Sequence, residues 1–363
     1  PSAVCLYPNG DPPGQGTILH RPALAETLRL VATDGRDAFY LGPAGDGIVE
    51  ATGGAITRED LGRRQTEWGV PASTDVFGLT AWTVPPNSQG WLTLATLWIF
   101  EMLDPPRDPN SPAFQHALIE AYRSVAWERA DTTTEPATAP FSSEHLLDAD
   151  RLAERATAID PGRARTWPTP KPAPGGTAYL TTRDHDGMVV SFIQSNFSGI
   201  GSGVSAGATG VWLHNRGAGF ELRPGHPNEL APGRRPLHTL APTLWTEGDR
   251  TRLVLGTRGG DQQPQILAQV AANQLWAKTE PEEAQRRPRW SIDDLASDGL
   301  PTIRYEARYD TSTIGGLAVK GHVLRAAGDW EQGWGPVSTI TVDETVRGAA
   351  DPRVSTTAAL FAG

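Results

Sequence analysis

Cysteine is almost missing from this sequence: its 363 residues contain a single cysteine, Cys5. The chain therefore cannot form an internal disulfide, and one thiol is compatible with reducing and oxidising compartments alike. The sequence also contains no hydrophobic run as long as a membrane-spanning helix requires. We therefore expect no membrane span, and both a cytoplasmic and a periplasmic or secreted location stay open.

Lysine is nearly absent as well. It occurs three times, so that 29 of the 32 basic residues are arginine. The 42 acidic residues outnumber the basic ones and give a formal net charge of −10. Binding to nucleic-acid phosphates requires a basic surface, and we therefore expect no nucleic-acid partner. The arginine bias fits either a GC-rich coding sequence or the recognition of carboxylates.

Metal-binding motifs are lacking too. The eight histidines form neither an HExxH motif nor a paired ligand spacing, and we expect neither a metal nor another cofactor. What the sequence does contain is an ordinary apolar content, with 38% hydrophobic residues and 39 glycines. Such a chain folds, as one large domain or two ordinary ones.

Helical periodicity dominates the first 160 residues. The spacing of apolar residues predicts helices within 21–35, 87–103, 111–130 and 142–160. The helix within 87–103 is apolar nearly all round, which is typical of a buried helix. Between the first two helices, 75–84 alternates like a β-strand and ends at a Pro-Pro pair.

The character of the chain changes at residues 161–176, PGRARTWPTPKPAPGG. Five prolines and three glycines without periodicity predict an extended, exposed and poorly ordered segment. The sequence after it is rich in strands, beginning with a hairpin around DHDG at 184–187. Further strands are predicted within 210–215, 252–257 and 339–343, and further helices within 263–277 and 282–287. The whole pattern indicates an α+β architecture of sheets covered by helices.

Several blocks in fixed order carry a family resemblance. They are STDVFGLTAWTVPPNSQG at 73–90, the long block TAYLTTRDHDG…RGAGF at 177–220, NELAPGRRPLHTLAPTLW at 228–245 and GTRGGDQQPQILAQVAANQLW at 256–276. Together they resemble the gamma-glutamyltransferases, and more narrowly the gamma-glutamyltransferase-like hydrolases and acylases of bacteria.

This resemblance implies the N-terminal-nucleophile (Ntn) hydrolase fold, an αββα sandwich, made as a precursor that cuts itself. Residues 1–160 would correspond to the later half of the large subunit and 161–176 to a linker that ends at the self-cleavage site. Residues 177–363 would form the small subunit. Because the family's large subunit has an upstream half, we expect the sandwich to be incomplete at its N-terminus.

The resemblance also implies the catalytic residues. Thr177 matches the nucleophile, so the bond Gly176–Thr177 would be cut. Once free, the α-amine of a terminal threonine has a pKa near 7.7–8.0 and can serve as the base for its own hydroxyl. Gly259 and Gly260 match the paired glycines of the oxyanion hole, and Ser195 matches a threonine that orients the nucleophile. Without the resemblance, there are simpler alternatives: Thr177 is an ordinary threonine at the start of a strand, and Gly259 and Gly260 form an ordinary turn.

The positions that match the family's donor pocket differ from its pattern. Gly219 replaces the acidic anchor of the donor amino group, Phe197 replaces an asparagine, and Arg216 replaces a glutamine. His238 and Thr239 replace two serines. An amino-group anchor is therefore lost, while an arginine fork suited to a carboxylate is gained. The alternative for Arg216 is an ordinary structural ion pair, and the alternative for His238 is a histidine packed in the protein without a role in the reaction.

The sequence therefore predicts a self-processing N-terminal-threonine amidohydrolase or acyltransferase that acts on γ-glutamyl or related acyl amides. Water or an amino acid or peptide would accept the acyl group, and the two subunits of one precursor would be partners. The alternatives are a cephalosporin- or glutaryl-type acylase of the same fold, and a non-catalytic homologue that never matures.

Overall fold

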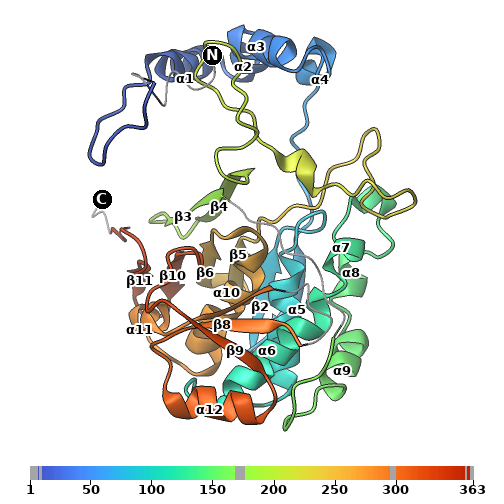
Figure 1. The fold of residues 1–363 in the computed structure, drawn as a ribbon, viewed down its shortest axis with the longest axis vertical. Helices are drawn as coiled ribbons and strands as arrows, with labels where there is room; N and C mark the ends of the chain where they lie inside the picture. Colours follow the sequence, from blue (N-terminus) through green and yellow to red (C-terminus); the bar gives the residue numbers. More distant parts are fainter. Residues whose placement is uncertain (1–6, 8–9, 168–175, 295–299, 356–357, 360–363) are drawn as a thin grey trace. The chain divides into compact units, whose positions relative to one another are not determined.

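The computed structural model describes residues 7, 10–167, 176–294, 300–355 and 358–359 (Figure 1). The chain forms two compact units. Unit 1 comprises Pro1–Trp68 and Asn196–Arg216, and unit 2 comprises Gly69–Ser195 and Gly217–Gly363. Residues on both sides of the Gly176–Thr177 bond thus belong to unit 2. Among the described residues, no helix combines the length and the apolar character needed to cross a membrane.

A six-stranded antiparallel sheet forms the centre of unit 2, with the strand order β1-β2-β5-β6-β10-β11. Its strands are β1 (Ala72–Val76), β2 (Leu79–Thr83), β5 (Thr243–Glu247), β6 (Arg250–Thr257), β10 (Val337–Val342) and β11 (Val346–Ala349). A second sheet of three strands contains β7 (Trp290–Asp294), β8 (Thr302–Glu306) and β9 (Val323–Ala327). The strands predicted within 252–257 and 339–343 are confirmed.

The single strand predicted over 75–84 is wrong, because this segment holds the turn of the β1–β2 hairpin. Phe77 and Gly78 have φ angles of 58° and 76°. Positive φ at both central residues is the geometry of a two-residue hairpin turn. The alternation of apolar residues continues across this turn, and the sequence pattern therefore did not reveal it.

One face of the large sheet is covered by α5 (Trp91–Met102) and α10 (Gln263–Ala271), and α6 (Pro112–Ala126) packs on α5 (Figure 1). Helix α5 lies between the sheet and α6, which explains why Leu92, Leu97 and Phe100 are completely buried. The predicted helices within 87–103, 111–130 and 263–277 are confirmed.

The remaining helices of unit 2 are short. They are α7 (Arg129–Thr132), α8 (Ser143–Leu146), α9 (Ala149–Thr157), α11 (Pro281–Arg286) and α12 (Thr311–Val319). The helix predicted within 142–160 is thus two helices. Ser142 caps the first and Asp148 caps the second, each by accepting a backbone N–H three residues later.

The predicted hairpin around DHDG is confirmed as β3 (Gly176–Arg183) and β4 (Val189–Phe197). It covers the other face of the large sheet. In β6, Leu253 and Leu255 belong to the helix-side core, so Gly256, which alternates with Leu255, faces the opposite side. There a Cβ on Gly256 would lie 2.1 Å from the Tyr179 ring. The layers are therefore helices, sheet and hairpin.

The described part of unit 1 contains the helices α1 (Pro22–Asp34), α2 (Arg36–Tyr40), α3 (Pro43–Ala51) and α4 (Arg58–Gly62), together with the segment 196–216. The helix predicted within 21–35 is confirmed as α1. The strand predicted within 210–215 is wrong, since this segment belongs to none of the sheets; it forms an isolated bridge between Ser205 and Trp212, flanked by backbone hydrogen bonds such as Leu213 N to Val204 O. Positive φ angles at Gly203, Gly207 and Gly210 interrupt the extended backbone near that bridge.

Residues 161–167 of the predicted linker are mostly exposed, but the buried Ala164 and Trp167 anchor this part to unit 2. The indole of Trp167 is buried, and its Nε1 donates to Glu120 Oε2 over 3.0 Å. The backbone N–H of Arg165 donates to the same oxygen, and Ala164 N donates to Lys320 O. A buried acceptor on α6 thus holds the first part of the proline-rich segment in place. The predicted remainder, 168–175, lies outside the described residues.

Candidate active site

Thr177 is the second residue of β3 and lies directly after the proline-rich segment. Side chains alternate along β3, so Thr177 shares the sheet-facing side with Tyr179. The Thr177 hydroxyl oxygen is buried, and it makes no hydrogen bond to any residue that the structure describes. Its capacity to donate and accept is therefore available to a reacting group.

Gly259 and Gly260 form a turn between the end of β6 and α10. Their φ angles are 124° and 58°, a conformation that side-chain-bearing residues rarely adopt. Gly260 opens a short 3-10 turn that leads into α10. Backbone N–H groups at the beginning of a helix lack partners within it and attract negative charge. Such N–H groups are of the kind that the predicted oxyanion hole requires.

The packing of Tyr179 on Gly256 brings the start of β3 to the end of β6 that leads into this turn. The Tyr179 hydroxyl hydrogen bonds with Ser191 Oγ over 2.8 Å, which links the two strands of the hairpin. Burial raises the pKa of Tyr179 to about 12, so its hydroxyl stays protonated at neutral pH. The sequence analysis missed Tyr179, whose only signal is its place two residues after the candidate nucleophile.

Ser195 is half-buried on the sheet-facing side of β4. In the hairpin turn, Asp184 N donates to Met188 O over 3.0 Å. Counting back along both strands from this pair, the register predicts that Ser195 lies opposite Thr177. Such a position suits a hydroxyl that orients the nucleophile.

His238 and Thr239 belong to an extended segment whose backbone is held by residues 87–89. His238 N donates to Asn87 O over 2.7 Å, and Gln89 Nε2 donates to Thr239 O over 2.7 Å. Thr239 is buried, and His238 is half-buried. Gln89 is a second residue that the sequence analysis missed, although a polar residue between a Pro-Pro pair and an apolar helix is a usable signal.

Gly219 packs closely against this segment. A Cβ at Gly219 would lie 2.8 Å from the carbonyl oxygen of Leu237, and Asn228 Nδ2 donates to Gly219 O. The backbone packing at this position therefore leaves no room for an acidic side chain unless the chain shifts.

Phe197 and Arg216 lie together in unit 1. The guanidinium carbon of Arg216 is 4.5 Å from the centre of the Phe197 ring, which is a cation–π contact. Both side chains are buried, and Phe197 has a φ angle of 79°. Burial, and then the charge of Arg216, lower the pKa of the neighbouring His214. The other predicted site residues belong to unit 2.

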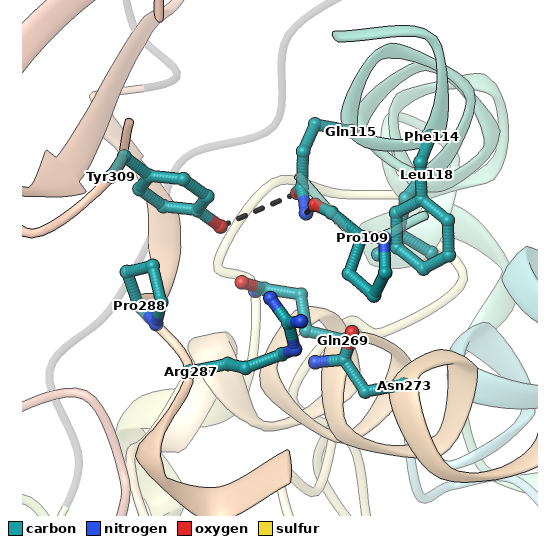
Figure 2. A pocket seen from close by; sticks show the side chains of 9 residues that line it. All are labelled: Pro109, Phe114, Gln115, Leu118, Gln269, Asn273, Arg287, Pro288 and Tyr309. Carbon is teal, nitrogen blue, oxygen red and sulfur yellow. Dashed lines mark hydrogen bonds between the residues drawn. The ribbon is translucent and has the colours of Figure 1, made fainter. Parts of the chain in front are cut away.

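A polar cavity lies elsewhere in unit 2, among α6, α10 and the segment after α11 (Figure 2). In it, the Tyr309 hydroxyl donates to Gln115 Oε1 over 3.3 Å, and Gln269 and Arg287 reach the same space. None of the predicted site residues lines this cavity. In the described part of the chain, no three His, Cys, Asp or Glu side chains are grouped to hold a metal ion.

Comparison with known proteins identifies relatives along nearly the whole chain. The family model described as gamma-glutamyltranspeptidase matches residues 2–361. The glutathione hydrolase-like YwrD proenzyme of Bacillus subtilis is 36% identical over 354 residues, which cover 95% of this chain and 66% of the relative. The oxamate amidohydrolase proenzyme of Klebsiella pneumoniae is 33% identical over 355 residues, which cover 96% of this chain and 67% of the relative.

Among solved structures, the cephalosporin acylase from Bacillus halodurans superimposes with a TM-score of 0.90 and 32% sequence identity. The match covers 99% of this chain and 66% of the acylase chain. This likeness confirms the predicted α+β fold of the Ntn hydrolases. The chain spans about two thirds of the length of these relatives.

Proposed function

Because the chain belongs to the gamma-glutamyltranspeptidase family, we propose that it forms part of a self-processing N-terminal-threonine amidohydrolase or acyltransferase. The observation that carries this proposal is the position of Thr177. Its buried hydroxyl has no partner among the described residues, and it lies at the start of a strand directly after the proline-rich segment.

Maturation would begin when Thr177 Oγ attacks the carbonyl carbon of Gly176. The C–N bond between Gly176 and Thr177 then breaks and the hydroxyl proton passes to the Thr177 nitrogen, which frees the α-amine; water hydrolyses the ester left on Oγ and releases the Gly176 carboxylate and the Thr177 hydroxyl. In the matured enzyme the same Oγ attacks the amide carbonyl of the donor, while the α-amine takes the hydroxyl proton and passes it to the leaving amine. Backbone N–H groups at Gly259 and Gly260 would stabilise the oxyanion, and each such donor is worth roughly 3–4 kcal/mol. Water or an amine acceptor then releases the acyl group.

The two products of the cut would stay together as a large and a small subunit. In the central sheet, β2 comes from before the cut and β5 from after it, and the two strands pair from Thr80↔Thr246 to Thr83↔Thr243. Helices α5 and α6 from the first product and α10 from the second contribute to one core. Cleavage of this one bond would leave these contacts in place.

We further infer that the acyl donor carries a carboxylate. The support is Arg216, a guanidinium held against the Phe197 ring, together with the close packing at Gly219 that excludes an acidic anchor for an amino group. The names of the relatives refer to glutathione, oxamate and cephalosporin. A glutaryl- or cephalosporin-type acylase is therefore the second candidate, favoured by the lack of an amino-group anchor.

The test is maturation of the full-length protein. Intact mass should reveal a fragment that begins at Thr177. Thr177→Ala should remain one chain without activity, and Thr177→Ser should retain part of both reactions because Oγ and the α-amine survive. Thr181→Ala is the matched control, since Thr181 lies on the same side of β3, and it should mature normally. Cleavage of the Thr177→Ala variant at the same bond would remove the nucleophile assignment.

A second measurement tests the base. Acylation of the new α-amine of Thr177 should abolish turnover of a chromogenic acyl anilide. Full activity with a blocked amine would assign the base to another group, with His238 as the first alternative.

A further inference from the structure

Resting on the function proposed above, we propose that Gln89 is a positioning residue for the reaction. Its side-chain amide ties the oxyanion turn at Gly260 to the substrate-facing segment at Thr239. Gly260 and Thr239 would then need no direct contact with each other. Gln89 comes from the product before the cut, whereas both residues that it holds come from the product after it.

The contacts of Gln89 are specific. Gln89 is completely buried, and its Nε2 donates to Gly260 O over 2.9 Å and to Thr239 O over 2.7 Å. Its backbone N–H donates to His238 O over 3.0 Å. Because both side-chain partners are carbonyl acceptors, only the NH₂ group can face them. One residue therefore supplies three hydrogen bonds to two separate segments.

The neighbours of Gln89 hold the same segment in register. Ser88 and His238 form a parallel bridge, and His238 N donates to Asn87 O. The Asn87 side chain donates to Pro236 O, and the Ser88 hydroxyl donates to Leu240 O. These bonds hold the segment at 236–240 on their own. The side chain of Gln89 adds a connection from this group to the glycine turn.

The turn needs such a connection because glycines restrain it weakly. Gly259 and Gly260 lack the Cβ atoms that limit backbone rotation in other residues, so the peptides between them can reorient at little cost. A hydrogen bond to Gly260 O opposes that rotation. Oxyanion donors act only when they are aimed at the developing charge, and removal of one donor lowers kcat by about 10²–10³-fold. A donor that remains but is less well aimed should therefore lower kcat by a smaller factor.

The experiment compares Gln89→Met with Gln269→Met in the matured full-length enzyme. Gln269 is a matched control, because it is a buried glutamine whose Nε2 also donates to two backbone carbonyls, those of Gln265 and Trp290. We expect Gln89→Met to lower kcat about 10- to 100-fold with KM nearly unchanged, and to slow self-cleavage similarly. Gln269→Met should lower Tm but leave kcat and the cleavage rate close to those of the wild type. The pH profile of kcat/KM should be the same in both variants, because neither residue is the base.

Equal changes in kcat for the two variants, or a Gln89→Met variant with normal kcat, would overturn the positioning role. If Gln89→Met does not fold, Gln89→His takes its place, since it keeps one N–H donor and should lose kcat to a smaller extent. A wild-type enzyme that neither cuts itself nor turns over the anilide would instead contradict the proposed function, so the two failures are distinguishable.

Discussion

Each of the two units of this protein is stabilised internally by a different kind of contact. Unit 2 has a large apolar core, in which Trp91, Leu97 and Trp245 are completely buried. In unit 1, close backbone approaches replace such a core. A Cβ on Gly47 would lie 2.5 Å from Ala206 O, and one on Gly210 would lie 2.7 Å from Leu24 N.

Hydrogen bonds from side chains to the backbone complete unit 1. Arg21 Nη2 donates to Gly210 O over 2.7 Å, and Thr27 Oγ1 donates to Thr209 O over 3.0 Å. Such contacts are few and local, whereas a close-packed apolar core resists every displacement of its members. The groups proposed for bond breaking lie in unit 2, and Phe197 and Arg216, proposed for donor recognition, lie in unit 1. Chemistry and recognition should therefore respond separately to substitution.

The largest expected effect is in the core of unit 2. Leu97→Ala removes a completely buried side chain from α5 and should lower the free energy of unfolding by about 2–5 kcal/mol. Leu28→Ala in unit 1 is the control, because Leu28 on α1 is 59% exposed and should change that free energy by less than about 0.5 kcal/mol. Urea denaturation followed by circular dichroism measures both. Equal destabilisation by the two variants would contradict the comparison.

Substitution of Arg216 should weaken donor recognition and leave the core of unit 2 unchanged. Loss of a charge-assisted hydrogen bond costs about 1.5–3 kcal/mol, so Arg216→Ala should lower kcat/KM for a glutaryl anilide by about 10- to 150-fold. The Tm of the protein should stay nearly constant. Arg223→Ala, at an exposed arginine of the following loop, is the control and should change neither quantity. A strong preference for the γ-glutamyl anilide that survives in Arg216→Ala would assign donor binding to other residues.

A third variant tests whether the close backbone contacts of glycines stabilise unit 1. Gly47→Ala introduces a methyl group against Ala206 O and should destabilise this contact by about 1–3 kcal/mol. Hydrogen exchange should accelerate in α3 and around residue 206, while protection in unit 2 stays the same. Gly62→Ala is the control, since its Cβ would meet only Leu41 at an ordinary 3.8 Å. Faster exchange throughout unit 2 would show that the units are not independent in this respect.

The smallest effect concerns a buried histidine pair in unit 2. His116 Nδ1 and His322 Nε2 are 2.8 Å apart, and His116 Nε2 lies 2.8 Å from Asp160 O. Burial, followed by the nearby His116, Arg123 and Lys320, lowers the pKa of His322 to about 3. Burial likewise lowers the pKa of His116, which the carbonyl of Asp160 and the charge of Glu120 partly oppose.

Both rings are neutral in the folded and unfolded states at a pH well above 6.5. Between that pH and about 3, the unfolded chain binds a proton on His322 that the folded protein excludes, so stability falls as the pH falls. Relative to His322→Gln, the wild type should lose up to about 1.4 kcal/mol of unfolding free energy for each pH unit in this window. Denaturation at several pH values measures the slope. His185→Gln is the control at a fully exposed ring, and an identical slope in all three proteins would contradict the prediction.

Much of the local structure was predictable from the sequence. The apolar runs of α5 and α10 and the DHDG hairpin depend on neighbours along the chain, whose spacing and turn chemistry are written in the sequence. The order of the blocks around Thr177 and the glycine pair likewise identified the family and the candidate nucleophile without coordinates. The two-residue turn inside 75–84 was not predicted, because the alternation of apolar residues continues across it.

Only the tertiary structure decided the contacts between distant segments. It pairs β2 with β5 across the cleavage site, and it brings Gln89 to Gly260 over a separation of 171 residues. It also buries Trp167 against Glu120 within a proline-rich run, and it packs Gly219 against the backbone of Leu237. Periodicity reports which residues are apolar and which neighbours share a face. Which distant carbonyl a buried amide donates to depends on how whole elements pack, and no local pattern records that.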